Sequence, residues 1–329
     1  MADPIPNAKP TPSNPLPSST VIESFKRKIS ENPEAATASV NSACAAFSQF
    51  LSTYGYGAPA YFINTTAQGY DKAPLQTLKE AVAKDGITAP YKGALRVLSR
   101  RLLGPIFAVP AGGYIRRQLE EGNYGQETQS LASASAISFV DSALTSRMET
   151  KEKRFQQSSM RSQNEAPVNI NLKGNRAAAF GLILARNSTF WSCGEIGSYV
   201  ANRRGENASK TQNIVTSLAL CAAAGVVATP IETTLSRMLK MEGDKNSSVS
   251  LKSAFNDVAA GGWRSFFTGV TVRMGFMGVG LACFAAVKPL KTSGHSFVDS
   301  CTKDVKKDGF AALESEKRKE KEKSSDRGK

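Results

Sequence analysis

Three arginines stand in or beside long apolar stretches of the sequence, where a charged side chain is costly. Arg100 comes directly before the apolar residues 102–115, and Arg186 and Arg273 interrupt two later stretches. An arginine at membrane depth is by default a functional residue that lines a binding site or a wet path. Several arginines facing one cavity would focus positive potential and attract carboxylates or phosphates. We therefore treat these three residues as candidate binding groups for a small anion.

The alternative role of these arginines is structural. Glu195, Glu232 and Asp141 lie in or near the same apolar stretches and could pair with them. A long arginine side chain can also extend to the membrane surface and leave the apolar region. Binding and structural pairing are both open at this point.

Other kinds of chemistry find little support in the composition. The chain has 329 residues, 42 Lys+Arg against 28 Asp+Glu, a formal net charge of +14, one histidine and five cysteines. The cysteines show no paired close spacing, which excludes a disulfide framework or a zinc ribbon. The basic excess lacks the interleaved aromatic residues that are typical of nucleic-acid binding. We expect no enzyme, no metal, no cofactor and no nucleic-acid partner.

Six stretches of helical character must position the arginines. They are residues 38–62, 102–115, 131–148, 177–200, 214–231 and 270–287. The clearest is 214–231, which has no charge and approaches the roughly 20 apolar residues that cross a bilayer. The others are short, carry charges or are rich in Ala and Ser, as expected for helices with one lipid face and one wet face. A soluble helical bundle with small residues in its core is the alternative.

Residues 75–93 are repeated at 251–269, with a constant offset and no gap. The matched pairs include Gly86 with Gly262, Tyr91 with Phe267, and Gly93 with Gly269. In each copy a short amphipathic helix should end at the first glycine, which can take the positive φ of a helix C-cap. The second glycine then opens a long apolar helix and allows two backbones to approach. Gly181 marks a weak third copy, so three units of about 90 residues account for the body of the chain.

These residues resemble the mitochondrial carrier family over roughly residues 38–290. The resemblance implies an all-α membrane protein of three tandem repeats, each with two transmembrane helices and a short matrix-side helix. The six transmembrane helices would have pseudo-threefold symmetry and lie in the mitochondrial inner membrane. The carrier domain would cover residues 36–292, with repeats at about 36–122, 123–206 and 207–292.

The odd-numbered helices of that family carry a Pro-x-Asp/Glu-x-x-Lys/Arg-x-Lys/Arg signature, whose ion pairs close the matrix end of the cavity. The resemblance implies a matrix gate formed by Pro59, Asp141, Pro230, Glu232 and Arg237. A proline removes one intrahelical hydrogen bond, so the helices should bend there. The signature is eroded. Its carboxylate positions hold Tyr61, Asp141 and Glu232, and its cation positions hold Asn64, Leu144 and Leu235. Arg147 and Arg237 lie close enough in sequence to pair with the acids instead.

In the same family, solutes contact residues about two turns into the even-numbered helices. Arg100 lies seven residues after Gly93, and the resemblance therefore implies that it binds the solute. The corresponding position of the third repeat holds Phe276, which departs from the family pattern. Arg186 and Arg273 are the other candidate cations, because they interrupt apolar stretches. The family's helix junctions hold cardiolipin or other anionic lipids, which would also explain the basic charge. The junction residues here are Gly86, Tyr91, Gly93, Gly181, Gly262, Phe267 and Gly269.

The sequence therefore predicts a transporter that moves a small anionic metabolite across the inner membrane by alternating access. The eroded signature and the poor middle repeat keep a second hypothesis open, because fold does not imply function. In that hypothesis the protein has the carrier fold, no longer transports, and serves as a structural or accessory subunit of a membrane complex.

Both ends of the chain are polar. Residues 1–35 are rich in Pro, Ser, Asn and Ala without an apolar block, which predicts disorder. They also lack the apolar core of a secretory signal. Residues 293–329 form a charged tail in which basic and acidic residues alternate, and we expect a solvated helix or coil there.

Overall fold

The computed structural model describes residues 19–161, 169–204, 210–275, 278–279, 283, 286–287 and 289–303. Within these residues all regular structure is helical and no strand is present, which confirms the expected all-α class. The chain divides into two compact units, one formed by Met1–Asn41 with Pro289–Lys329 and the other by Ser42–Lys288.

The first unit contains α1 (Ser19–Glu31), the beginning of α2 (Pro33–Ser52) and the helical residues 289–303. Ile29 of α1 is buried against Val298 and Cys301 of the last helix. The expectation that residues 1–35 are disordered is therefore wrong for α1 and for the residues that begin α2. The proline-rich composition that predicts disorder does not describe α1. Apolar residues at helical spacing give this helix a face that packs.

The remaining parts of the two polar ends lie outside the described residues. These are residues 1–18 and 304–329, so the disorder predicted for the start and the solvated helix or coil predicted for the end stay predictions there. Part of the sixth expected stretch, between 276 and 288, also lies outside.

The second unit begins with a series of helical segments broken by two π-helical turns. They are the end of α2, η1 (Thr53–Gly57), α3 (Ala58–Tyr70), α4 (Pro74–Asp85), η2 (Ala89–Tyr91), α5 (Ala94–Leu103), η3 (Gly104–Ala108) and α6 (Val109–Glu121). Three long helices follow, then a short one. They are α7 (Gln126–Ser159), α8 (Arg176–Arg204), α9 (Lys210–Lys245) and α10 (Leu251–Ala260), with η4 (Trp263–Phe267) and helical residues 270–275 after them.

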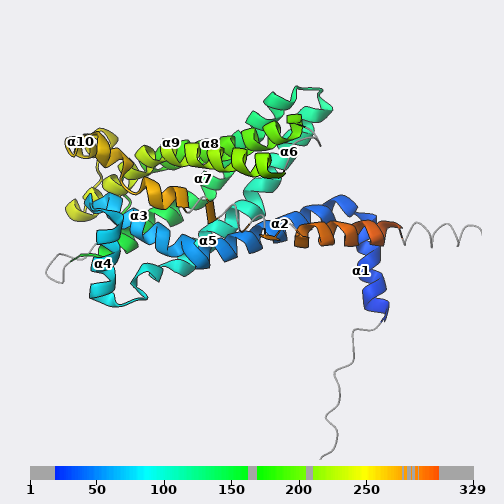
Figure 1. Cartoon of the computed structure of the whole chain (residues 1–329), viewed down its shortest axis with the longest axis horizontal. Helices are drawn as coiled ribbons and strands as arrows, with labels where there is room; N and C mark the ends of the chain where they lie inside the picture. Colours follow the sequence, from blue (N-terminus) through cyan, green and yellow to red (C-terminus); the bar gives the residue numbers. More distant parts are fainter. Residues whose placement is uncertain are drawn as a thin grey trace, which may run out of the picture. The chain divides into compact units, whose positions relative to one another are not determined.

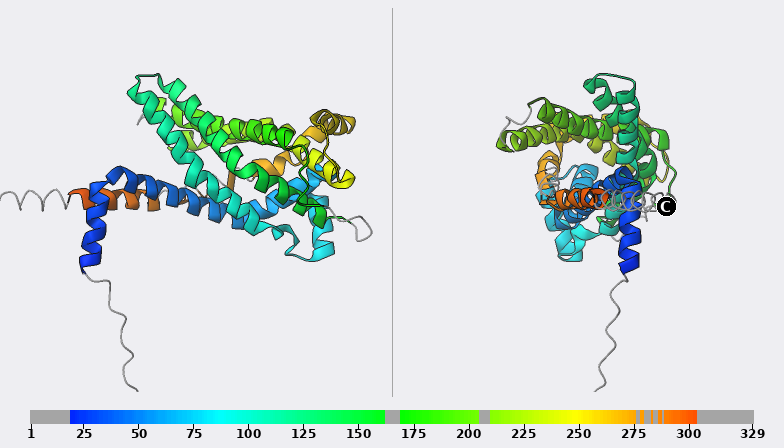
Figure 2. Two further views of the ribbon diagram at one scale, coloured as in Figure 1. Left: turned by 180° about the vertical axis from the view of Figure 1, so that it is seen from behind. Right: turned by 90° about the vertical axis from the view of Figure 1, so that its right-hand side faces the viewer.

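Helices α6, α7, α8 and α9 pack in sequence order, each against the next (Figures 1 and 2). Helix α3 packs against both α7 and α9, which also contact each other. Helices α3, α7 and α9 therefore meet, and the side chains on their facing sides form the interior of this unit.

Proline explains where the first two long segments change geometry. Pro59 stands in the first turn of α3, directly after the π turn η1, and Pro105 lies inside the π turn η3. A proline has no N–H to donate, and a π turn is one way in which a helix accommodates the missing bond. Pro230 instead lies within α9, where its carbonyl also accepts a hydrogen bond from the Thr234 hydroxyl at 2.9 Å.

The two copies of the repeated segment have the same local structure. Helices α4 and α10 are the two short helices, and both are followed by glycines with positive φ, 79° at Gly86 and 83° at Gly262. Gly93 and Gly269 have φ values of 84° and 80°, just before the next helix. The predicted positive-φ glycines are confirmed. The second glycine of each pair is needed for its own backbone conformation, and Gly269 is also needed for close approach, because a Cβ atom there would collide with Asn64.

The middle copy does not share this geometry. Gly181 lies within α8, five residues after its start at Arg176, and open space surrounds the position of a Cβ atom there. It is neither a turn nor a helix junction, so that expectation is wrong. Before α8, residues 169–175 form a turn and irregular chain. The match to the other copies at Gly181 was too short to specify a turn.

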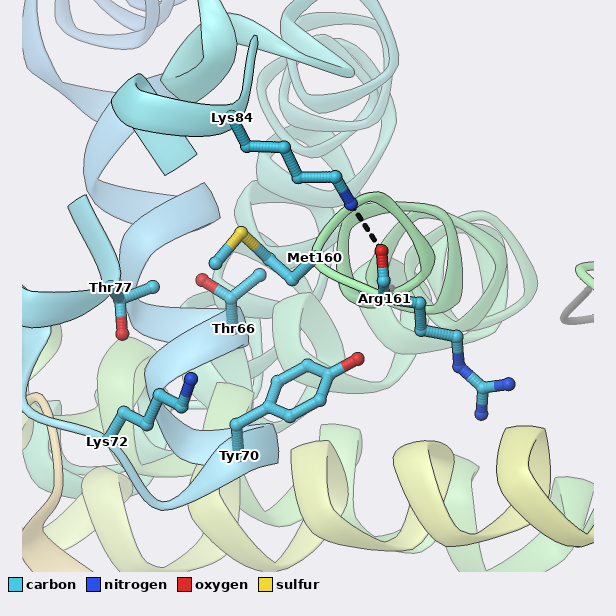
Figure 3. Close-up of a pocket in the computed structure, with 7 residues that line it drawn as sticks. All are labelled: Thr66, Tyr70, Lys72, Thr77, Lys84, Met160 and Arg161. Atoms are coloured by element: carbon cyan, nitrogen blue, oxygen red, sulfur yellow. Dashed lines mark hydrogen bonds between the residues drawn. The ribbon is translucent and has the colours of Figure 1, made fainter. Parts of the chain in front are cut away.

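A cavity of about 300 Å³ lies between α3, α4 and the end of α7 (Figure 3). Its cations are already engaged. Lys84 donates hydrogen bonds to the carbonyls of Ser159 and Arg161, and Lys72 pairs with Glu80 at 2.6 Å. The hydrogen bond from Lys72 holds the pKa of Glu80 below its usual value. This cavity therefore offers little free charge to a ligand.

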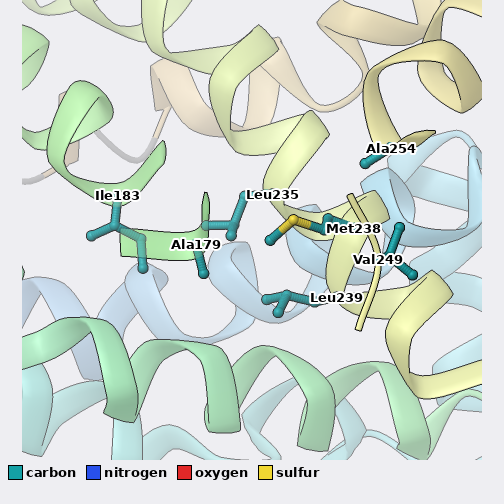
Figure 4. Close-up of a cluster of buried hydrophobic side chains, with 7 residues drawn as sticks. All are labelled: Ala179, Ile183, Leu235, Met238, Leu239, Val249 and Ala254. Carbon is teal, nitrogen blue, oxygen red and sulfur yellow. The ribbon is translucent and has the colours of Figure 1, made fainter. Parts of the chain in front are cut away.

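The main hydrophobic cluster of this unit lies where α8, α9 and the start of α10 meet (Figure 4). Its buried side chains are Ala179, Ile183, Leu235, Met238, Leu239, Val249 and Ala254. Burial of this apolar surface holds α8, α9 and α10 together, at about 25 cal/mol for each Å² removed from water.

Within the described residues, one helical stretch is long and apolar enough to cross a membrane. It is Leu218–Lys245 in α9, with a mean hydropathy of 1.6 over its best 18-residue window. It overlaps the clearest of the six stretches predicted from the sequence. The buried helix of a soluble core can meet the same criterion. The hydropathy of the described helices therefore gives one candidate membrane span.

Helices α6 and α7 come close together at Gly112. A Cβ atom added at this position would collide with the Ile137 side chain and the Ser133 hydroxyl of α7. We expect Gly112→Ala to lower the free energy of unfolding by about 1–3 kcal/mol, as overpacked substitutions do. Gly113 is the matched control, because a Cβ atom there meets nothing within 4 Å. Thermal unfolding of the full chain checks this, and equal behaviour of both variants would contradict the close contact.

Candidate functional site

Helix α7 carries three buried charged residues on one face. Glu149, Glu152 and Lys153 are spaced three and four residues apart, and each is at most 1% exposed. Positions with this spacing lie on the same side of a helix. They face the region where α7 meets α3, α5, α8 and α9, and each of them bonds to a residue on another element.

Glu149 binds two of the candidate arginines. Arg100 Nη1 of α5 lies 3.1 Å from Glu149 Oε2, and Arg186 Nη2 of α8 lies 2.9 Å from the same oxygen. Arg186 also donates to Glu149 Oε1. Arg100 makes a second ion pair with Glu152, at 3.1 Å. Because charge-assisted hydrogen bonds are the strong ones, these contacts tie α5 and α8 firmly to α7.

Glu232 of α9 is the second centre of the network. It pairs with Lys153, with Arg186 at 2.8 Å and with Arg273 at 3.4 Å. Arg186 therefore bridges Glu149 and Glu232, and through them links α7, α8 and α9. Arg273 makes only this one contact to the network, and its Nε has no hydrogen-bond partner among the residues that the structure describes.

Tyr61 brings α3 into the same network. Its hydroxyl donates to Glu149 Oε1 at 3.2 Å. Its ring lies 4.8 Å from the Arg100 guanidinium and 4.9 Å from the Lys153 ammonium. A tyrosine at the expected carboxylate position thus still contacts cations, through its π face instead of an ion pair.

We use the name central network for these eight residues: Tyr61, Arg100, Glu149, Glu152, Lys153, Arg186, Glu232 and Arg273. The structure brings all three candidate arginines together in it, and it engages all three with carboxylates. Two of the acids, Glu149 and Glu152, and the cation Lys153 were missed. These three charged residues stand at helical spacing immediately after the stretch 131–148. That stretch was defined by its apolar and small residues, so it stopped before them.

Asp141 of α7 lies beside the central network and forms no ion pair with a described residue. Its Oδ2 accepts hydrogen bonds from Asn187 at 3.2 Å and from the Trp191 indole at 3.4 Å. Asn187 in turn accepts from Arg186 at 2.7 Å. Asp141 therefore contacts the network only through an amide, and the predicted pairing with Arg147 is absent from the described contacts.

Arg237 belongs to another contact. Its Nη atoms lie 3.6 Å from Asp71 and 3.3 Å from Asp257, so it does not pair with Glu232 or Asp141. Five residues separate Arg237 from Glu232 on α9, which turns the two side chains to different sides of the helix. Leu235, at the expected cation position, lies in the hydrophobic cluster of Figure 4. Lys153 of α7 takes the role expected for a base on α9.

A layer of amide and hydroxyl groups adjoins the central network where α3, α7 and α9 meet. Ser236 donates to Gln68 Oε1 at 3.1 Å, and Gln157 donates to the Ser236 carbonyl at 2.8 Å. Gln68 also donates to the Thr268 carbonyl at 3.1 Å, beside the Gly269 junction. The meeting point of α3, α7 and α9 is thus held by neutral hydrogen bonds as well as ion pairs.

None of the predicted helix-junction residues is a member of the central network. Tyr91 is 43% exposed. The rings of Trp263 and Phe267 pack edge to face, with their centroids 6.1 Å apart. Their contact with lipid stays a prediction. Within the described part of the chain, no group of three His, Cys, Asp or Glu residues could hold a metal ion.

The central network offers cations to an anionic ligand. Its carboxylates and cations can exchange partners, and one arginine at its edge, Arg273, is weakly held. No protein-family model and no curated protein matches this sequence. Any functional conclusion therefore depends on the residues and contacts described above.

Proposed function

We propose that this protein is a carrier-type transporter that moves a small anionic metabolite by alternating access, with six membrane-spanning helical segments in the mitochondrial inner membrane. In transporters of this general kind, substrate sites lie near the middle of the membrane and are shared by repeated elements. The sequence motifs that resemble the mitochondrial carrier family support this function.

One observation carries the proposal: six helical segments each contribute a side chain to the central network. The contributions are Tyr61 from α3, Arg100 from α5, Glu149 from α7, Arg186 from α8, Glu232 from α9 and Arg273 from residues 270–275. A purely structural ion pair needs two segments. A network that joins all six can change partners when any one of them moves.

The charge of the network supports an anionic solute. Its ion pairs join four cations to three carboxylates, which leaves one positive charge in excess. Arg273 is the least engaged cation, since it makes one ion pair at 3.4 Å. We assign the first contact with the anion to Arg273, because the other cations must give up stronger ion pairs to bind it.

Reconstituted vesicles test this function with a variant that should still fold. Removing the charge of Arg273 leaves three cations facing three carboxylates, so we expect Arg273→Gln to retain the fold. Wild-type protein should exchange succinate, citrate or inorganic phosphate saturably, and Arg273→Gln should reduce that exchange at least about tenfold. Arg264→Gln is the matched control, since Arg264 is exposed and lies over the Trp263 ring. Undiminished exchange by Arg273→Gln would contradict the assignment.

A second candidate function is favoured by the pairing of the candidate arginines. Arg100, Arg186 and Arg273 all contact carboxylates in the structure, as they would in a protein that no longer transports. Such a protein would be a structural or accessory subunit of a membrane complex. It would fold, show no exchange with any of the three anions, and migrate in native gels of solubilised membranes well above its own mass.

A further inference from the structure

A second cavity, of about 390 Å³, lies between α7, α8 and the connection that precedes α8. Ligand pockets for small molecules typically measure about 300–1,000 Å³, so this one is large enough for a small molecule. It is separate from the central network and from the junctions at Gly93 and Gly269. Its wall is formed by the C-terminal half of α7, the first turn of α8 and residues 171–175.

The cavity is strongly basic. Arg147 and Lys151 line it from α7, Lys173 lines it from the connection, and Arg176 lines it from the start of α8. Throughout the described residues none of these four cations has a carboxylate partner, and no carboxylate lines the cavity. The N-terminus of α8 adds positive potential at the same place, because the helix dipole points its positive end there.

A fifth cation, Arg154, forms the buried floor of the cavity. It is 4% exposed, and its Nη atoms bond to Glu242 and to the Leu172 carbonyl at 2.5 Å each. Its charge is therefore balanced by Glu242. Its Nε, however, has no hydrogen-bond partner in the described part of the protein. A buried donor without a partner is costly, and a ligand oxygen in the cavity could satisfy it.

The rim of the cavity is held in place. Glu242 accepts a hydrogen bond from the Asn175 backbone N–H at 2.6 Å, and the Asn175 side chain caps α8 by accepting from Ala178 N–H at 3.1 Å. Gly174 has a φ of 53°, and a Cβ atom there would collide with Glu242 and Arg154. The connection can follow this path only with glycine, which keeps Lys173 and Arg176 beside the cavity.

We propose that this cavity binds a phosphate group. Four cations without a carboxylate partner among the described residues, and a guanidinium N–H without an acceptor there, match the charge and the several acceptor oxygens of a phosphate ester or diphosphate. The group can belong to a soluble phosphorylated molecule or to a phospholipid head group, since both present the same chemistry. The site is independent of transport, because it shares no residue with the central network.

The test measures binding to the full chain in neutral detergent by titration calorimetry, with pyrophosphate and short-chain phosphatidic acid as the two probes. The variant Lys173→Ala/Arg176→Ala removes two rim cations without touching Arg154. We expect it to weaken binding at least about tenfold. Lys252→Ala on α10 is the control, because Lys252 is an exposed cation outside the cavity. Arg273→Gln should bind as the wild type does, which separates this site from the transport function.

The two probes identify the source of the phosphate. Binding of pyrophosphate that depends on Lys173 and Arg176 supports a soluble phosphorylated ligand. Binding of phosphatidic acid alone, with the same dependence, supports a lipid head group. Absence of binding by both probes, or binding that Lys173→Ala/Arg176→Ala leaves unchanged, overturns the proposal.

Discussion

Glu149→Gln should lower the free energy of unfolding by about 3–5 kcal/mol, the range found when one partner of a buried ion pair is removed. Glu149 is fully buried and accepts hydrogen bonds from Arg100, Arg186 and Tyr61. Glutamine has nearly the same volume, so the loss comes from charge rather than from packing. Arg100 and Arg186, which are 8% and 7% exposed, then lose the carboxylate that they share.

Chemical denaturation of the full chain in detergent measures this effect. Glu120→Gln on α6 makes the same chemical change at an exposed position, and it should alter stability by no more than about 0.5 kcal/mol. A double variant, Glu149→Gln/Arg186→Gln, removes a cation as well and should recover part of the loss. If Glu149→Gln were as stable as Glu120→Gln, the central network would not be a stabilising feature of the fold.

Gly269→Ala is expected to cost about 2–5 kcal/mol, for two separable reasons. The φ of 80° at Gly269 is strained for any residue with a Cβ atom, at about 1–2 kcal/mol. The new methyl group would also collide with the Asn64 side chain, which adds about 1–3 kcal/mol of overpacking. The collision would separate α3 from the segment that begins at Gly269.

Gly93→Ala isolates the first of these costs. Gly93 is the equivalent glycine of the first repeated segment, and its φ of 84° and ψ of 5° place it in the left-handed region. A Cβ atom there would meet no atom closer than 3.6 Å, which is ordinary van der Waals contact. It should therefore lose only about 1–2 kcal/mol. Adding Asn64→Ala to Gly269→Ala should remove the collision and leave the φ strain. Equal losses in Gly93→Ala and Gly269→Ala would show that Asn64 does not pack as described.

The local conformation of the repeated segments could be predicted from the sequence. A short amphipathic helix followed by a glycine has few conformations open to it, and Gly86 and Gly262 both adopt the positive φ that this pattern requires. The all-α class was equally accessible, because helical periodicity extends through most of the chain. At Gly181 the same reasoning failed, since a single glycine without the preceding short helix carries little information.

The sequence by itself determined the all-α class, the glycine turns of the two clear repeats and which arginines are unusual enough to need a partner. Only the tertiary structure decided which carboxylates those partners are. Arg186 meets Glu149 and Glu232, which lie 37 and 46 residues away, and Lys153 meets Glu232 across 79 residues. Such pairings depend on how each helix is rotated about its axis and which helices become neighbours. Periodicity within one helix defines its faces, but it does not say which face another helix will cover.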